Sequence, residues 1–430
     1  MNDGYPPASR RGLWIAPHLL GLLIAAAGLL LLTGCSVRDP VGGAREEKRW
    51  QNNFKLPPKP AAGLAPRLHL LIRPGFLPPE VLEFFSTSYG TQITTEFFQQ
   101  NSELKQKLAE NPKQFDLVMA SDYLIEQLAK EKRLKVLEKS NLGNLGNLPV
   151  YFFRLPFDPE LRHSVPLFFA TLGIVYNSDF VREVPKLNNL RVENPEEDLL
   201  LFGHRAIIDE PRVALTAALL AEGIEPNAFD KTALDRVANR LVFGASLLGV
   251  RFLSSELPGA LAKNDITLAL TWSGDAAAAR RQNKSIRFNL PARMKLVKVE
   301  CMAVAGETQH QATAEFFLNY LLMPQISGEL TNYSLYANTN EASRRHIQRD
   351  ILNGPAYLQA AVTSRTYLRY LGEADAEFDR AWARVKANAP EIREKTPLRK
   401  SRAENGDEDI LAERQPNDTR SKAAATERRN

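Results

Sequence analysis

The sequence contains few of the residues that metal sites and disulfide-stapled folds require. Among its 430 residues there are only two cysteines, Cys35 and Cys301, and six scattered histidines. Two cysteines cannot build a disulfide framework, so a sizeable hydrophobic core must hold the fold. No two histidines stand four residues apart, which excludes the common helical zinc motif. We therefore predict no metal site.

Catalytic and nucleotide-binding motifs are also missing. The sequence contains no C-x-x-C pair, no Walker loop, no G-x-S-x-G turn and no G-x-G-x-x-G after a strand. The neighbouring carboxylates Asp209 and Glu210 point to opposite sides of an extended segment, so they cannot act together on one bond. We predict a protein that is not an enzyme and uses no cofactor.

Charge of one sign is not concentrated anywhere in the chain. The formal net charge is +5, and both ends contribute basic residues. Because there is no basic patch or stripe, nucleic acid is not an expected partner. Hydrophobic residues make up 44% of the sequence, which is enough for a buried core.

The N-terminus has the pattern of an export signal. Arg10 and Arg11 precede an apolar run, Leu19 to Leu32, that is shorter than a membrane span. The run ends in L-T-G-C (32–35), which resembles the lipobox of bacterial lipoproteins. That resemblance implies a signal peptide of residues 1–34, cut before a lipidated Cys35. The alternative is an ordinary N-terminal membrane anchor. We expect an extracytoplasmic protein tethered by lipid to the inner or the outer membrane.

Two further segments have the composition of unstructured chain. Residues 35–66 are rich in Pro, Gly and Ala after the cysteine, which predicts a flexible tether. Residues 391–430 carry many charges of both signs and almost no large apolar side chains, which predicts a disordered tail. The chain between them is long enough for two lobes.

This middle part alternates strand-like and helix-like segments, which favours a mostly parallel sheet with helices on both faces. Short apolar runs predict strands at 68–72, 92–97, 115–119 and 266–272. Helices are expected from Pro78-Pro79 to before Gly90, from a cap at Asn101 or Ser102, from Asp122 after a break at Ala120-Ser121, and from Pro211 to Ala221.

The stretch from Ile266 to Arg281 predicts a strand that delivers Trp272 to a turn. Ser273-Gly274-Asp275 follows, and Ser or Asp would cap the next helix. Open α/β sheets build binding crevices in this way. The alternative is that Trp272 is a core residue and Asp275 only a cap.

Seven segments in order resemble the polyamine (spermidine/putrescine)-binding proteins of bacterial ABC importers, over most of residues 67–345. They are P-G-F-L-P-P-E-V-L (74–82), F-D-L-V-M-A-S-D-Y (115–123), P-F-D-P (156–159), S-V-P-L-F-F-A-T-L-G-I-V-Y-N (164–177), I-D-E-P-R (208–212), T-W-S-G-D-A (271–276) and L-Y-A-N-T-N-E-A (335–342).

The resemblance implies an α/β fold of the type II periplasmic-binding-protein class, with two lobes around a ligand cleft. Lobe 1 would comprise residues 67–167 plus 303–345. Lobe 2 would comprise residues 168–302, with C-terminal helices at about 350–388 packed on it. Crossover strands near 168–173 and 298–304 would join the lobes.

The family's ligand contacts carry over with substitutions. A polyamine site needs aromatic faces for the methylene stems and carboxylates for the ammonium groups. Matching or conservatively changed positions are Ser121, Tyr123, Trp272 and Tyr336, Phe76 in place of a Tyr, and Glu210 and Glu300 in place of Asp. Departing positions are Arg73 and Lys298, each in place of a Trp, and Val213 in place of a Glu.

The presence of Arg73 and Lys298 at ligand-contact positions leaves the identity of the ligand undecided. A cation facing a ligand ammonium at 4 Å would cost about 4 kcal/mol at an effective dielectric of 20. Either Arg73 and Lys298 pair internally, or the ligand is not a simple polyamine. Because residues two apart in a strand share a face, Lys298 can pair with Glu300.

From this we expect a monomeric solute-binding lipoprotein of a polyamine-type ABC importer. It would capture a small polar or charged solute, close by a hinge and deliver the solute to a membrane permease. One alternative is a cleft recast for an amino-acid-like or anionic solute, held by Arg73 and Lys298. Another is a sensor or envelope interaction protein that has lost transport.

Overall fold

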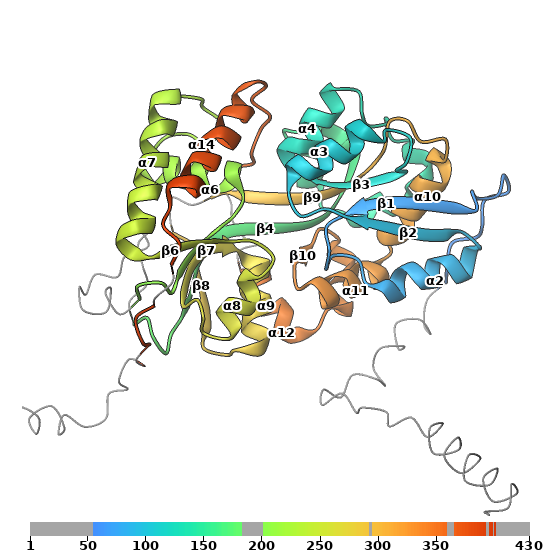
Figure 1. The fold of residues 1–430 in the computed structure, drawn as a ribbon. Coiled ribbons are helices and arrows are strands. Elements are labelled where there is room, and N and C mark those ends of the chain that lie inside the picture. The colour runs from blue at the N-terminus through green and yellow to red at the C-terminus, as the bar shows by residue number, and fades with distance from the viewer. Residues whose placement is uncertain are drawn as a thin grey trace, which may run out of the picture. The chain divides into compact units, whose positions relative to one another are not determined.

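The structure is a computed structural model that describes residues 55–182, 201–291, 295–358, 365–392, 395–398 and 400. The predicted signal peptide and Cys35 lie outside the described residues. Within them, ten strands form one mixed sheet in the order β2-β1-β3-β9-β4-β7-β5-β6, and β8 and β10 each pair with β4. Helices pack on the sheet in two groups, one near β1–β3 and the other near β5–β7 (Figure 1).

The strands are β1 (Arg67–Ile72), β2 (Gln92–Phe97), β3 (Leu117–Ser121), β4 (Ser164–Asn177), β5 (Arg205–Ile208), β6 (Val250–Leu253), β7 (Leu268–Trp272), β8 (Ile286–Asn289), β9 (Val297–Val304) and β10 (Ala337–Asn338). The helices are α2 (Pro79–Tyr89), α3 (Asn101–Glu110), α4 (Asp122–Lys130), α6 (Pro211–Ala221), α7 (Lys231–Leu248), α8 (Leu257–Ala262), α9 (Ser273–Gln282), α10 (Gln311–Leu321), α11 (Pro324–Ser334), α12 (Arg349–Leu352), α13 (Pro355–Leu358) and α14 (Ala374–Asn388). Short 3₁₀ turns lie at Lys139–Asn141, Gly143–Asn147, Val150–Arg154, Pro159–Leu161 and Glu341–His346.

The two longest strands, β4 and β9, join the halves of the sheet. The first part of β4 pairs antiparallel with β9, and its second part, from Leu172, pairs antiparallel with β7. β9 in turn pairs antiparallel with β3. These strands contain the segments 168–173 and 298–304 that were expected as crossovers, and Figure 1 shows both running between the two groups of helices.

The expectation of a mostly parallel sheet is wrong for this central part. β1 pairs in parallel with β2 and β3, and β5 with β6 and β7, so each half is parallel as predicted. All pairings of β4 and β9 are antiparallel. The reason is that the chain passes between the halves along single strands and not through a helix, which only a parallel crossover requires.

Local sequence signals set most helix and strand ends. Pro79 opens α2 at its first turn, and Gly90 ends it in the left-handed region with φ of 71°. β2 and α6 have the predicted bounds. Two details differ. Ala120 and Ser121 extend β3 because they pair with Cys301 and Glu300 of β9, and α9 begins after Trp272 without a Ser or Asp side-chain cap.

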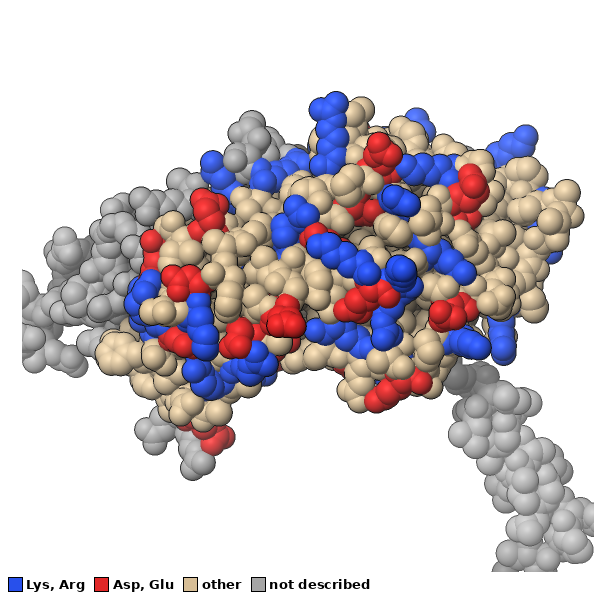
Figure 2. All heavy atoms as spheres, turned by 90° about the horizontal axis from the view of Figure 1, so that it is seen from above, with Lys and Arg blue, Asp and Glu red and all other residues tan. Residues whose placement is uncertain are grey.

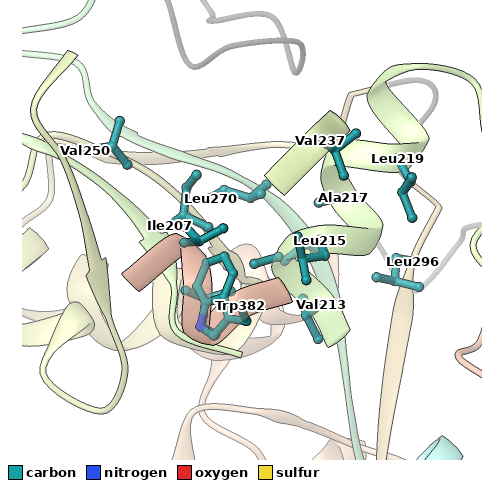
Figure 3. Close-up of a cluster of buried hydrophobic side chains, with 14 of the residues drawn as sticks. Ile207, Val213, Leu215, Ala217, Leu219, Val237, Val250, Leu270, Leu296 and Trp382 are labelled. Carbon is teal, nitrogen blue, oxygen red and sulfur yellow. The ribbon is translucent and has the colours of Figure 1, made fainter. Parts of the chain in front are cut away.

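Helix α14 closes the core of the second half. Its buried residues Phe378, Ala381, Trp382 and Val385 have the spacing of one helix face and pack against α6 and α7. Figure 3 shows the Trp382 indole among side chains of the sheet and of α6. α14 is therefore part of the same hydrophobic core.

Residues 366–371, which we call the strap, connect the two halves through polar contacts. The Arg369 guanidinium donates two hydrogen bonds of 2.8 Å to Glu126 of α4, and the Tyr370 N–H donates a third of 3.0 Å. On the other side, the Asn227 amide donates to the Tyr367 carbonyl at 2.9 Å and accepts from the Arg369 N–H at 2.9 Å. Burial alone would raise the pKa of Glu126, but these donors and Lys130 lower it to about 2.

Parts of the predicted tether and tail contact this unit. The Tyr89 hydroxyl donates to the Pro57 carbonyl at 2.9 Å, and Lys395 pairs with Asp265. The Thr396 N–H donates to the Phe202 carbonyl at 3.3 Å. The ordered chain thus begins before residue 67 and continues beyond residue 391.

The surface of the described residues mixes charges of both signs. On the face in Figure 2, acidic and basic side chains lie interspersed and neither sign forms a continuous field. None of the helices in the described ranges combines the length and the hydrophobicity needed to cross a bilayer.

Removing the strap's guanidinium tests its contribution. Arg369→Ala should lower the free energy of unfolding by about 1–2 kcal/mol, because Glu126 loses two charge-assisted hydrogen bonds while its side chain stays 7% exposed. Arg380→Ala is the matched control, since this exposed residue of the same C-terminal region only pairs with Glu377. It should change stability by less than about 0.5 kcal/mol in urea titration. Equal losses in both variants would contradict the strap's role.

Candidate functional site

A cleft lies where the carboxyl ends of β1, β2 and β5 meet the start of α4 and helix α14. The space between its walls, open solvent included, is about 580 Å³. Open α/β sheets place ligand crevices at such strand ends. The lining residues are Arg73, Gln99, Gln100, Asn101, Ser102, Lys105, Tyr123, Gln127, Asp209, Glu210, Pro211, Arg212, Asp375 and Asp379.

A buried ion cluster centred on Lys298 lies beside this cleft. The Lys298 ammonium is 3.2 Å from Glu300 Oε1 and 3.4 Å from Glu210 Oε1. It also lies 4.7 Å from the centroid of the Trp272 ring, and the Trp272 indole N–H donates to Glu210 at 3.1 Å. The predicted pairing of Lys298 with Glu300 on one face of a strand is confirmed.

The cluster keeps its charges although it is buried. Burial alone would lower the pKa of Lys298, but the Glu210 and Glu300 carboxylates outweigh it and raise that pKa. Burial would also raise the pKa of Glu210, but Lys298 and then Arg73 outweigh it and lower this pKa. The two ions therefore hold each other in the charged state, as a buried pair must.

Arg73 turns towards the wall of the cleft. Its guanidinium donates to the Gln99 carbonyl at 2.7 Å and to the Asn101 side chain at 2.6 Å, and Nε lies 3.6 Å from Glu300. It also lies over the Phe98 ring, 4.9 Å from the centroid. Arg73 and Lys298, the two cations that the resemblance matches to aromatic positions, thus both have partners within the chain.

The remaining predicted residues fall into two groups. Ser121 and Tyr123 lie at the junction of β3 and α4; Ser121 pairs in register with Glu300, and the Tyr123 hydroxyl accepts from Asn101 at 2.7 Å. Val213 lies buried below them on α6, 3% exposed. These three residues border the Lys298 cluster.

Phe76 and Tyr336 form a separate contact beside this group. Their ring centroids lie 5.0 Å apart, and neither residue lines the cleft described above. The Tyr336 hydroxyl donates to Asp275 at 2.7 Å, so Asp275 is an acceptor for Tyr336 and for Thr271 and not the expected helix cap. A Cβ on Gly274 would lie 2.4 Å from the Tyr336 ring, which explains why glycine stands there.

Trp272 combines both readings of the sequence. Its side chain is only 1% exposed and belongs to the hydrophobic core of the second half. Its ring nevertheless contacts the Lys298 ammonium and its N–H holds Glu210. It is a core residue that also orients the ion cluster.

Sequence reasoning missed several polar residues of the cleft. Arg212 is 3% exposed, lies 3.1 Å from Asp375 of α14 and stacks 4.1 Å above the Phe378 ring. Asp209 accepts from the Trp382 indole at 2.6 Å and pairs with Lys386. The sequence signals only that Asp209 and Glu210 point to opposite sides. In the structure both line the cleft, and their carboxylates have different partners, Trp382 and Trp272. No group of three or more metal-ligating side chains is present in the described part of the chain.

Asp122, the first residue of α4, is the most strongly perturbed carboxyl near the cluster. Burial, with a smaller effect of the Glu300 charge, raises its pKa to about 8. Its oxygens accept from the Tyr123 N–H at 2.9 Å and the Leu368 N–H of the strap at 3.3 Å. At neutral pH it is therefore largely protonated.

This shift predicts a pH dependence of stability with a defined sign. Between the unfolded pKa of about 3.9 and the folded value, the native protein binds the extra proton, so stability falls as pH rises, by up to about 1.4 kcal/mol per unit. Because the Asn side chain of Asp122→Asn cannot ionise, the free energy of unfolding of this variant should fall less steeply from pH 5 to 8 in urea titrations. Asp230→Asn, at the exposed N-cap of α7, should keep the original slope. Identical slopes for all three proteins would refute the assignment to Asp122.

Comparison with known proteins finds distant relatives of this chain. No family model matches the chain. A putrescine-binding periplasmic protein of Escherichia coli is 26% identical over 341 residues, which cover 74% of this chain and 91% of that protein. A spermidine/putrescine-binding periplasmic protein of Salmonella typhimurium is 24% identical over 318 residues, covering 73% and 89%. These relatives are binding proteins, in agreement with the prediction that the chain is not an enzyme.

Solved structures share the fold. The spermidine/putrescine ABC transporter substrate-binding protein of Streptococcus pneumoniae superposes with a TM-score of 0.62 at 21% identity, covering 76% of this chain and 100% of that one. A lipoprotein of Treponema pallidum superposes with a TM-score of 0.66 at 18% identity, covering 74% and 99%. The chain thus has the α/β fold of ABC-transporter substrate-binding proteins and is a distant relative of the spermidine/putrescine-binding proteins.

Proposed function

We propose that this protein is the solute-binding component of an ABC importer of the spermidine/putrescine type. The observation that carries the proposal is the polar cleft at the strand ends, in a chain related to such binding proteins over about three quarters of its length. The protein captures a small polar or charged solute there and delivers it to a permease. It acts by binding, as a monomer, without a cofactor.

The mechanism follows from the central strands. We infer that residues 67–167 plus 303–345 act as one lobe, and residues 168–302 with the C-terminal helices at about 350–388 as the other. Because β4 and β9 join them, the lobes open and close by bending at these strands. The strap's contacts with Glu126 and Asn227 limit how far they separate.

The protein works outside the cytoplasmic membrane on a lipid anchor. The support is the L-T-G-C segment at 32–35 after an apolar run, together with a structural relative that is itself a lipoprotein. A single acyl chain binds membranes only weakly, so stable anchoring requires more than one chain on Cys35.

A second candidate is the same receptor with an amino-acid-like solute. Arg73 and Lys298 border the cleft, and cations there favour a carboxylate over an ammonium. A simple anion is less favoured, because it would compete with Glu210 and Glu300 for these cations. A zwitterion offsets that competition, because its ammonium group can pair with a carboxylate that its own carboxylate displaces.

Replacing Cys35 tests the anchor. Cys35→Ala should release the protein from the membrane fraction or leave its signal uncleaved, because no thiol is available for lipid. Metabolic labelling with a palmitate analogue, followed by fractionation, measures this. Cys301→Ala is the control, since Cys301 is buried and should not affect labelling. Label that persists in Cys35→Ala rules out the lipoprotein assignment.

Two matched tryptophans test the cleft. Trp272 and Trp382 are each 1% exposed, and each indole donates to a carboxylate, Glu210 or Asp209. Trp272→Leu and Trp382→Leu should each cost about 2–4 kcal/mol of stability. Trp272→Leu should lower solute affinity more than Trp382→Leu, because Trp272 contacts both Lys298 and Glu210, whereas Trp382 reaches the cleft only through Asp209.

Thermal-shift screening of the intact protein against polyamines, amino acids and organic acids supplies the solute for this test. A ligand at 100 times its Kd adds about 2.7 kcal/mol of stability. If the two variants lose binding equally, Trp272 serves only as packing. If no compound of any class stabilises the unmodified protein, the proposed function fails.

A further inference from the structure

Trp272, Glu210 and Glu300 together form an ammonium cage. An aromatic face and two carboxylates in a desolvated site are the groups that hold a primary ammonium ion most strongly. Glu300 is 1% exposed, and no hydrogen bond within the described residues reaches either of its oxygens. Glu210 is fixed by the Trp272 N–H. The cage is thus a built cation site.

The cation in the cage belongs to the chain itself. The Lys298 ammonium lies 4.7 Å from the Trp272 ring centroid and within 3.4 Å of an oxygen of each carboxylate. We propose that Lys298 is a tethered ammonium that fills the cage, so that this receptor excludes diamines and polyamines from it and takes a zwitterionic or uncharged polar solute in the adjoining cleft. The solute class rests on the proposed function, whereas the occupied cage does not.

Tethering makes the exclusion effective. Lys298 sits on β9 between β3 and β4, so its backbone is fixed in the middle of the sheet. A free amine must compete with the Lys298 ammonium, which its attachment to the chain keeps at an effective concentration of about millimolar or more in the cage. The displaced ammonium would also lose both carboxylates in a buried position.

The charge balance of the cleft favours the solute class. Three cations, Arg73, Lys105 and Arg212, and four carboxylates, Asp209, Glu210, Asp375 and Asp379, line it. The partners just outside the lining, Lys298, Lys386 and Glu300, bring the total to five charges of each sign. Arg212 and Asp375 already pair with each other. A dication would therefore meet no excess of carboxylates, whereas a zwitterion or a neutral polar molecule adds no net charge.

Chemical rescue tests the occupied cage directly. Lys298→Ala removes the ammonium and most of its stem, and leaves Trp272, Glu210 and Glu300 in place. Propylamine should raise the thermal midpoint of Lys298→Ala and leave that of the unmodified protein unchanged. Propanol, the uncharged analogue of propylamine, should stabilise neither protein. Lys105→Ala is the matched control, because Lys105 lines the same cleft outside the cage.

Calorimetric titration with putrescine and spermidine gives the second readout. Lys298→Ala should bind them at least about tenfold more tightly than the unmodified protein. Lys105→Ala should gain much less, because it changes only the overall charge. Should Lys298→Ala fail to fold, the charge-balanced double variant Lys298→Ala with Glu300→Gln takes its place.

The outcomes separate the two proposals. Equal gains in Lys298→Ala and Lys105→Ala, or tight spermidine binding by the unmodified protein, overturn the tethered ammonium and leave the receptor function standing. Rescue by propylamine supports the tethered ammonium whatever solute is found. Failure of rescue in a folded variant overturns it as well.

Discussion

The antiparallel pairing of β4 with β9 is the constraint on which the rest of the structure depends. These strands connect two parallel half-sheets that share no other strand pairing within the described residues. They also carry the ion cluster, because Lys298 and Glu300 lie on β9 opposite Ala170 and Phe168 of β4. The strand pair that connects the two halves therefore also carries the buried ion cluster beside the cleft. Any bending there acts directly on buried charges.

Buried charge explains how the halves hold together around this joint. The cluster brings Arg73 from the end of β1 and Glu210 from the end of β5 to the same β9 residues. Each ion is costly to bury alone and stable only while its partners stay within a few ångströms. The strap repeats this arrangement at the periphery, where Glu126 of α4 is satisfied by Arg369. The two halves are thus held together by contacts that the chain makes with itself.

The sequence predicts the parts that local chemistry determines. Proline and glycine set the ends of α2, and strand alternation puts Lys298 beside Glu300. The adjacent carboxylates Asp209 and Glu210 accept hydrogen bonds from different tryptophans. Contacts between distant residues carry no comparable signal. Glu126 and Arg369 are 243 positions apart, and nothing near either residue indicates the other. The extension of β3 through Ser121 likewise depends on pairing with β9, which only the folded sheet provides.

Because Lys298 stands among the predicted ligand contacts, the solute of the related proteins does not follow for this chain. The resemblance matches Lys298 to an aromatic position of the polyamine-binding proteins. A lysine at such a position removes a ring and supplies the cation that a ring would contact. The Trp272 ring makes a cation–π contact, and its cation is the Lys298 ammonium, which is part of the chain itself. The entropy of bringing the ammonium to the cage is then lost on folding and not on binding. If Lys298 fills the cage, the cage stabilises the protein in the absence of solute, and recognition of the solute falls to the groups that line the adjoining cleft.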